Sequence, residues 1–189
     1  MVKKIFPLLL LLTLSWSCAT HRPPPPSLEI GDLPPSLIAE FSLEERILAE
    51  DAWSNLKKGE VNKAEKMIAK LGEKNPLYHV GLGYAAYLLD KTQTAEEFFK
   101  AALKNYPDMV LIHSGLAHVY LKTGREDEAF TELREVLKRE PDHPWAKQEY
   151  ETLKNKKTEE SLSEAKNALS QGDTEKSKRN INDVEVRLV

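Results

Sequence analysis

A repeat with a period of 34 residues constrains the fold of this chain more than any other feature. Residues 83–107 and 117–141 share a small residue at the start, an alanine in the middle and a proline at the end. The matched pairs are Leu82 and Leu116, Gly83 and Ala117, Ala95 and Ala129, Phe99 and Leu133, Ala102 and Val136, and Pro107 and Pro141. Because self-similarity at a period of about 20–50 residues marks stacked structural units, this chain is expected to build its core by repetition.

Each unit is predicted to be a pair of helices. Lys, Glu, Ala and Leu, which are good helix formers, dominate the middle of the 189-residue chain, and apolar residues recur there at helical spacing. The predicted helices are 43–57, 61–74, 77–89, 94–105, 109–122 and 126–139. A hairpin of two such helices cannot bury its apolar side alone, so neighbouring hairpins are expected to stack into one continuous core.

The period, the small residues and the closing prolines resemble the tetratricopeptide repeat. The resemblance implies an all-α solenoid of helical hairpins, with about three repeats over residues 42–155 and a spacing of 31 residues between the first two. Residues 156–189 echo the first repeat weakly, which predicts a degenerate fourth repeat or a helical cap. The resemblance places Gly83 where two helices cross closely, whereas Gly81 departs from the family pattern and is expected to leave room on the groove side. The charged stretch 155–160 is predicted to be either a hinge or the exposed middle of a long helix.

The first 17 residues have the layout of an export signal. Lys3 and Lys4 precede an apolar run that is too short to span a membrane. The stretch that ends at Cys18 resembles a bacterial lipoprotein signal, which implies that residues 1–17 are removed and that Cys18 is lipidated. Ala19 after the cysteine implies the outer membrane. The alternative is ordinary cleavage after Ala19, which gives a soluble secreted protein.

Residues 18–41 are predicted to be a proline-rich tether. Four consecutive prolines at 23–26 favour extended polyproline II, which rises about 3.1 Å per residue. A spacer of this kind would hold an anchored domain clear of the membrane, and a short lead-in turn is expected at 36–41. The alternative is a proline-rich docking motif for another domain.

Composition and motifs argue against several functions. The formal net charge is −3 and the chain has no basic stripe, which argues against nucleic acid as a partner. The sequence contains no metalloprotease, hydrolase or phosphate-loop motif, so we predict no enzymatic activity and no cofactor. His113 and His118 are five residues apart, about 140° around a helix, and therefore share no ligand face. No metal site is predicted.

The resemblance implies a partner-binding groove on the concave face, which the first helix of each repeat lines. The implied groove residues are Ala49, Trp53, Leu56, Val80, Tyr84, Tyr87, Ser114, His118 and Leu121. Trp53, Tyr84 and His118 fall at the same repeat position and are expected to form a row of rings, the type of residue that supplies interface hot spots. The alternative is that Trp53 and Tyr87 are core aromatics with only their tips exposed.

Together these features predict a membrane-anchored scaffold of the bacterial cell envelope that faces the periplasm from the outer membrane. Its groove is expected to bind a peptide or a partner helix during assembly of an envelope complex, such as a secretion, pilus or outer-membrane assembly machine. The alternative is a structural lipoprotein that self-associates as a homodimer through its repeat face.

Overall fold

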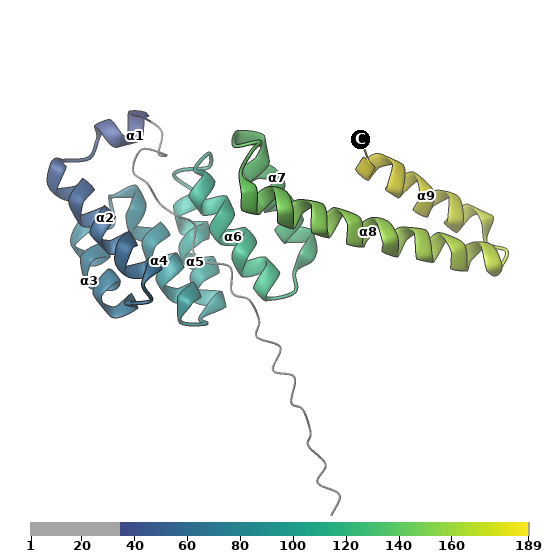
Figure 1. Ribbon diagram of the computed structural model, residues 1–189, viewed down its shortest axis with the longest axis horizontal. Coiled ribbons are helices and arrows are strands. Elements are labelled where there is room, and N and C mark those ends of the chain that lie inside the picture. Colours follow the sequence, from purple (N-terminus) through teal and green to yellow (C-terminus); the bar gives the residue numbers. More distant parts are fainter. Residues whose placement is uncertain (1–34, 189) are drawn as a thin grey trace, which may run out of the picture.

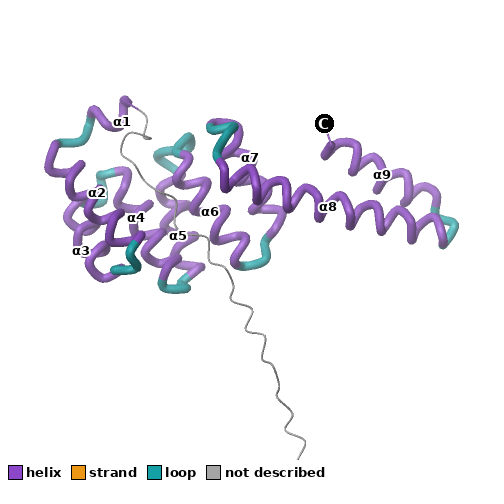
Figure 2. The backbone as a smooth tube through the Cα atoms, viewed as in Figure 1, coloured by secondary structure: helices purple, strands orange, loops and turns teal. Residues whose placement is uncertain are grey.

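The computed structural model describes residues 35–188, and helices are the only regular elements in that range (Figure 1, Figure 2). In chain order they are α1 (Pro35–Ala39), α2 (Leu43–Lys57), α3 (Val61–Leu71), α4 (Pro76–Leu88), α5 (Thr92–Leu103), α6 (Val110–Lys122), α7 (Glu126–Arg139), α8 (Pro144–Ser170) and α9 (Thr174–Leu188). From α2 to α7, successive helices pair as hairpins that stack side by side. The predicted all-α solenoid of helical hairpins is confirmed, and α2 and α7 begin and end at the predicted residues.

Local side-chain chemistry sets the helix ends. The Ser42 hydroxyl accepts a hydrogen bond from the backbone N–H of Glu45 at 3.1 Å, and the Glu45 carboxylate accepts one from the N–H of Ser42 at 2.8 Å. This reciprocal capping box starts α2. Gly59 and Gly124 have φ values of 74° and 72°, which residues with side chains adopt only at a cost. They therefore let the chain turn between the two helices of a hairpin.

The third helix ends earlier than predicted. Gly72 takes a φ of 77° and stops α3 after Leu71. The Asn75 side chain then accepts a hydrogen bond from the N–H of Leu77 at 2.9 Å, and Pro76 takes the first position of α4. The shorter spacing between the first two repeats is thus taken up in the turn before Pro76.

Helices approach closely, both within a hairpin and between hairpins, where a large side chain of one helix packs on a glycine of another. An ideal Cβ on Gly115 of α6 would lie 2.4 Å from the Phe99 ring of α5, and one on Gly83 of α4 would lie 2.7 Å from the same ring. The close crossing predicted at Gly83 is therefore confirmed. The expectation for Gly81 is wrong, because its Cβ would lie 2.8 Å from Ile68 of α3. That side of α4 packs on the preceding repeat and leaves no room for a ligand.

The charged stretch 155–160 lies within α8, so the hinge alternative is wrong and the long-helix alternative is confirmed. The boundary predicted between residues 155 and 156 falls inside this helix. Lys156 Nζ lies 2.6 Å from the Glu126 carboxylate, and Lys157 pairs with Asp127. Both acids occupy the first turn of α7, where the helix dipole favours negative charge. The lysines therefore fix the middle of α8 against the start of α7.

The predicted signal at 1–17, Cys18 and most of the predicted tether lie outside the described residues. The end of the tether is described, and α1 lies at the expected lead-in turn with Leu37 and Phe41 buried against the core. Between residues 35 and 188, no helix combines the length and the apolar character that crossing a membrane requires.

Candidate functional site

The first helices of the hairpins bring rings together in two groups. In the first group, the Tyr84 ring meets Trp53 and Phe99 edge to face, with centroids 5.0 Å and 4.9 Å apart. The Tyr84 hydroxyl donates a hydrogen bond to the Leu111 carbonyl at 3.0 Å. Burial raises the pKa of Tyr84 well above its usual value, so the hydroxyl stays protonated. Its hydrogen bond to Leu111 therefore joins α4 to α6.

Tyr87, His118 and Trp145 form the second group, which extends across α4, α6 and α8. The His118 ring centroid lies 5.7 Å from that of Tyr87 and 3.8 Å from that of Trp145. Lys122 places its ammonium 4.7 Å from the Tyr87 ring centroid, within range of a cation–π contact. The prediction of one row through Trp53, Tyr84 and His118 is therefore only partly right: Trp53 meets Tyr84, but His118 belongs to a separate group with Tyr87 and Trp145.

The predicted groove residues lie on α2, α4 and α6, and eight of the nine are buried. Those eight side chains are at most 3% exposed, and Leu121 is half-buried. This burial fits the alternative in which Trp53 and Tyr87 are core aromatics. The assignment of the nine residues to a partner-binding groove stays a prediction, and a partner contacts the buried ones only if this face opens.

Two buried polar atoms beside the second ring group lack a hydrogen-bond partner in the described part of the chain. They are Ser114 Oγ, one helical turn before His118, and Trp145 Nε1. A buried polar atom without a partner costs about 1–3 kcal/mol. Sequence reasoning missed Trp145 as a site residue. It lies 34 residues after Leu111, so extending the repeat by one period would have placed it on the corresponding helix face.

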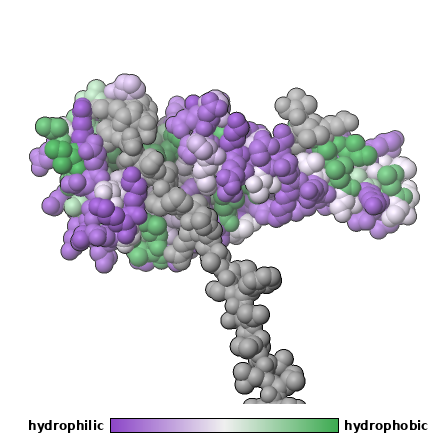
Figure 3. All heavy atoms as spheres, in the orientation of Figure 1, coloured by the Kyte–Doolittle hydropathy of each residue, from purple (hydrophilic) through white to green (hydrophobic). Residues whose placement is uncertain are grey.

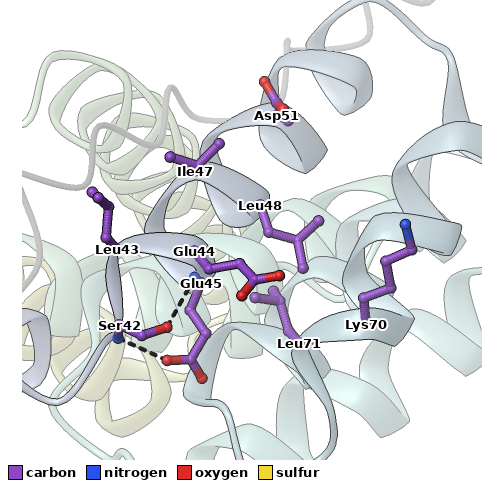
Figure 4. A pocket seen from close by; sticks show the side chains of 9 residues that line it. All are labelled: Ser42, Leu43, Glu44, Glu45, Ile47, Leu48, Asp51, Lys70 and Leu71. Carbon is purple, nitrogen blue, oxygen red and sulfur yellow. Dashed lines mark hydrogen bonds between the residues drawn. The ribbon is translucent and has the colours of Figure 1, made fainter.

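A pocket of about 680 Å³ opens at the outer side of the first hairpin (Figure 4). Its lining residues are Ser42, Leu43, Glu44, Glu45, Ile47, Leu48, Asp51, Lys70 and Leu71. Leu43 is 74% exposed and Ile47 is 52% exposed. In the part of the chain that the structure describes, this end of the solenoid therefore exposes apolar side chains among its polar ones, whereas most repeat arrays end in a polar outer surface.

His113 lies buried between α6 and α7. Its Nδ1 is 2.7 Å from the Glu132 carboxylate, and its Nε2 is 2.8 Å from the Pro107 carbonyl. When Glu132 is ionised, both partners can only accept hydrogen bonds, so both ring nitrogens donate and the ring is an imidazolium. Burial lowers the pKa of His113, and Arg139 lowers it further, but the hydrogen bonds to Glu132 and Pro107 outweigh both and raise it above its usual value.

The raised pKa of His113 predicts that the protein is less stable at alkaline than at mildly acidic pH. The stabilisation that the charged His113 ring contributes is complete below its unfolded-state pKa of about 6.5. It is lost as the pH rises through the higher pKa that His113 has in the folded state. His113→Gln should lower the free energy of unfolding by about 1.5–3 kcal/mol near pH 6 and should flatten its dependence on pH. Urea unfolding at mildly acidic and at alkaline pH measures both effects. Equal pH dependence in the two proteins would contradict a charged ring, since the other histidines are common to both.

The side chains of the two ring groups are suited to binding a partner through non-covalent contacts. Among residues 35–188, no cluster of three or more histidine, cysteine or carboxylate side chains is placed to hold a metal ion. His113 faces Glu132, whereas His118 faces rings. What the ring groups and the two buried polar atoms can offer a partner is apolar contact, ring stacking and hydrogen bonds.

Comparison with known proteins identifies the repeats. Two family models described as tetratricopeptide repeat match the chain, one over residues 52–110 and the other over residues 86–156. Their combined range runs from the middle of α2 to the middle of α8. No curated protein and no solved structure gives a significant match.

Proposed function

The chain is a tetratricopeptide-repeat protein, and on that premise we propose that it is a membrane-anchored scaffold that binds a peptide on the face of its first helices. The repeats support a role in protein–protein interaction. In this proposal a lipid on Cys18 anchors the chain, and the proline-rich tether holds the solenoid away from the bilayer. The setting is the assembly of an envelope complex on the periplasmic side of a bacterial outer membrane.

The observation that carries the proposal is the pair of buried polar atoms, Ser114 Oγ and Trp145 Nε1, beside the second ring group. Both atoms are buried, so a ligand reaches them only when this face opens. A backbone carbonyl of the ligand can then accept a hydrogen bond from each, and the rings can contact the flanking side chains. A ligand that supplies these acceptors removes a cost of about 1–3 kcal/mol per atom. An extended segment presents carbonyls along its length, whereas a helix bonds its carbonyls internally. The proposal therefore favours an extended peptide over a partner helix.

Crosslinking in intact envelopes, followed by purification of the full-length protein, tests both the proposed binding face and the proposed lipid anchor. The double variant Ser114→Ala with Trp145→Phe keeps the rings and removes both donors. It should stay on the membrane and bind the partner about thirtyfold less tightly, since each of the two lost hydrogen bonds is worth about 1 kcal/mol. Cys18→Ser should instead leave the membrane fraction.

Tyr150→Phe is the matched control for the double variant. It removes a hydroxyl from a ring that stacks on Phe130, at a centroid distance of 4.5 Å, away from the second ring group. Partner recovery should be unchanged. If the double variant recovers the same partners in the same amount, this face is not the binding site. If Cys18→Ser remains on membranes after a salt wash, the lipid anchor is wrong.

A further inference from the structure

The second ring group crosses three helices of the stack. Tyr87 lies on α4, His118 on α6 and Trp145 at the start of α8. The ring centroid of His118 is 5.7 Å from that of Tyr87 and 3.8 Å from that of Trp145. Grooves lined by aromatic rings bind proline-rich segments in the polyproline II conformation. The ring group is therefore suited to a ligand that crosses the helices in an extended form.

The two buried donors beside the rings require a ligand with free carbonyl groups. Ser114 Oγ and Trp145 Nε1 have no hydrogen-bond partner among the described residues. Polyproline II makes no internal hydrogen bonds, so each of its carbonyls can accept one. Trp145 is the second residue of α8 and is half-buried. Its ring can therefore turn outward and present Nε1 to a ligand without the unfolding of a helix.

The apolar surface around the ring group is short. Leu121 is half-buried and lies three residues after His118, on the same side of α6. The middle of α8 is mostly hydrophilic (Figure 3), and Asn155 and Lys156 are exposed there. Four residues of polyproline II span about 12 Å, whereas neighbouring packed helices lie about 8–10 Å apart. A run of about four prolines therefore matches this surface in length.

The chain carries such a run shortly before its first described helix. Residues 23–26 are consecutive prolines, and α1 begins at Pro35. Leu37 and Phe41 are buried against the core, so the chain enters the solenoid at a fixed point before α2. The eight residues 27–34 reach roughly 26 Å when extended. At about 8–10 Å per helix, this length takes the prolines from α2 past α4 to the ring group.

We propose that the prolines at 23–26 occupy the second ring group of their own chain, a conclusion that rests on the proposed function because it concerns the same face. The prolines are then a docking motif for the chain's own repeats as well as part of a spacer. A segment on a short linker has an effective concentration in the millimolar range. A dissociation constant about tenfold lower is enough to keep the face mostly occupied and to weaken partner binding about tenfold.

Binding of a labelled peptide to the full chain in detergent tests the proposal. The probe is a synthetic peptide of residues 20–30 with a fluorophore, and anisotropy measures its binding. The serine-tether variant carries Pro23→Ser, Pro24→Ser, Pro25→Ser and Pro26→Ser, which keeps the length of the tether but removes the polyproline segment. Because its face is free, this variant should bind the peptide about tenfold more tightly than the wild type.

Two further variants control this comparison. His21→Ser with Arg22→Ser changes the same tether but keeps the prolines, so it should bind the peptide as weakly as the wild type. Adding Ser114→Ala and Trp145→Phe to the serine-tether variant locates the site. Peptide binding should then fall about thirtyfold, the factor expected for the loss of two hydrogen bonds.

Three results would overturn the proposal. The first is equal binding of the peptide to the wild type and the serine-tether variant, and the second is no binding to that variant. The third is a wild-type protein that sediments as a dimer while the serine-tether variant is a monomer, because the prolines would then occupy the face of a second copy.

The peptide assay and the envelope crosslinking can fail separately. If the serine-tether variant does not bind the peptide but partner recovery still depends on Ser114 and Trp145, the face binds a different peptide. Only the occupation by the chain's own prolines is then wrong. If the peptide binds as expected but crosslinking recovers no partner, the face serves the tether, and the proposed scaffold function is wrong.

Discussion

Replacing Phe99 with alanine is expected to lower the free energy of unfolding by about 3–5 kcal/mol. The Phe99 side chain is 0% exposed and lies where three helices meet. Its ring contacts that of Tyr84 and packs directly on Gly83 and Gly115. Because glycines have no side chain that could move into the space, the cavity left by the ring cannot collapse easily. The loss is therefore expected in the upper part of the range for buried aromatic residues.

Phe98→Ala is the matched control for this truncation. Phe98 precedes Phe99 on α5 and is only half-buried, so the same chemical change removes fewer contacts. Its cost should be less than half that of Phe99→Ala when both are measured by denaturant unfolding. Equal losses would show that the junction of α4, α5 and α6 does not depend on the Phe99 ring.

The sequence predicted the architecture because the signals that define it are local. Helix spacing of apolar residues and the turn glycines Gly59 and Gly124 lie within a few residues of the elements they set, and the 34-residue period follows from their repetition. The misplaced end of α3 had an equally local signal in Gly72. Gly81 was misjudged because its role depends on Ile68, a residue of the preceding hairpin.

Features that depend on packing between helices could not be predicted in this way. The spacing of Trp53, Tyr84 and His118 gives the helix face on which each lies, but it does not say how deeply that face is buried. The ion pair between His113 and Glu132 joins residues 19 positions apart on two helices. Nothing in the sequence around either residue predicts the other as its partner. The ring contact of His118 with Trp145 likewise depends on how α8 packs against α6, which apolar periodicity does not specify.

Replacing Gly115 with valine is expected to destabilise the solenoid by about 3 kcal/mol, at the upper end of the usual range for an overfilled core. A Cβ at this position would lie 2.4 Å from two carbon atoms of the Phe99 ring, and the ring is itself fixed by Gly83 and Tyr84. The higher helix propensity of valine relative to glycine offsets only a few tenths of a kcal/mol. Either the ring or the helix α6 must therefore move.

A double-mutant cycle tests whether this clash is the cause. In a protein that already carries Phe99→Ala, the valine at position 115 enters the cavity that the ring has left, so part of its cost should disappear. The combined loss is expected to be at least about 1 kcal/mol smaller than the sum of the two single losses, as measured by denaturant unfolding. Additive losses would mean that residues 99 and 115 act independently. The close approach of the second and third hairpins would then have to depend on other contacts.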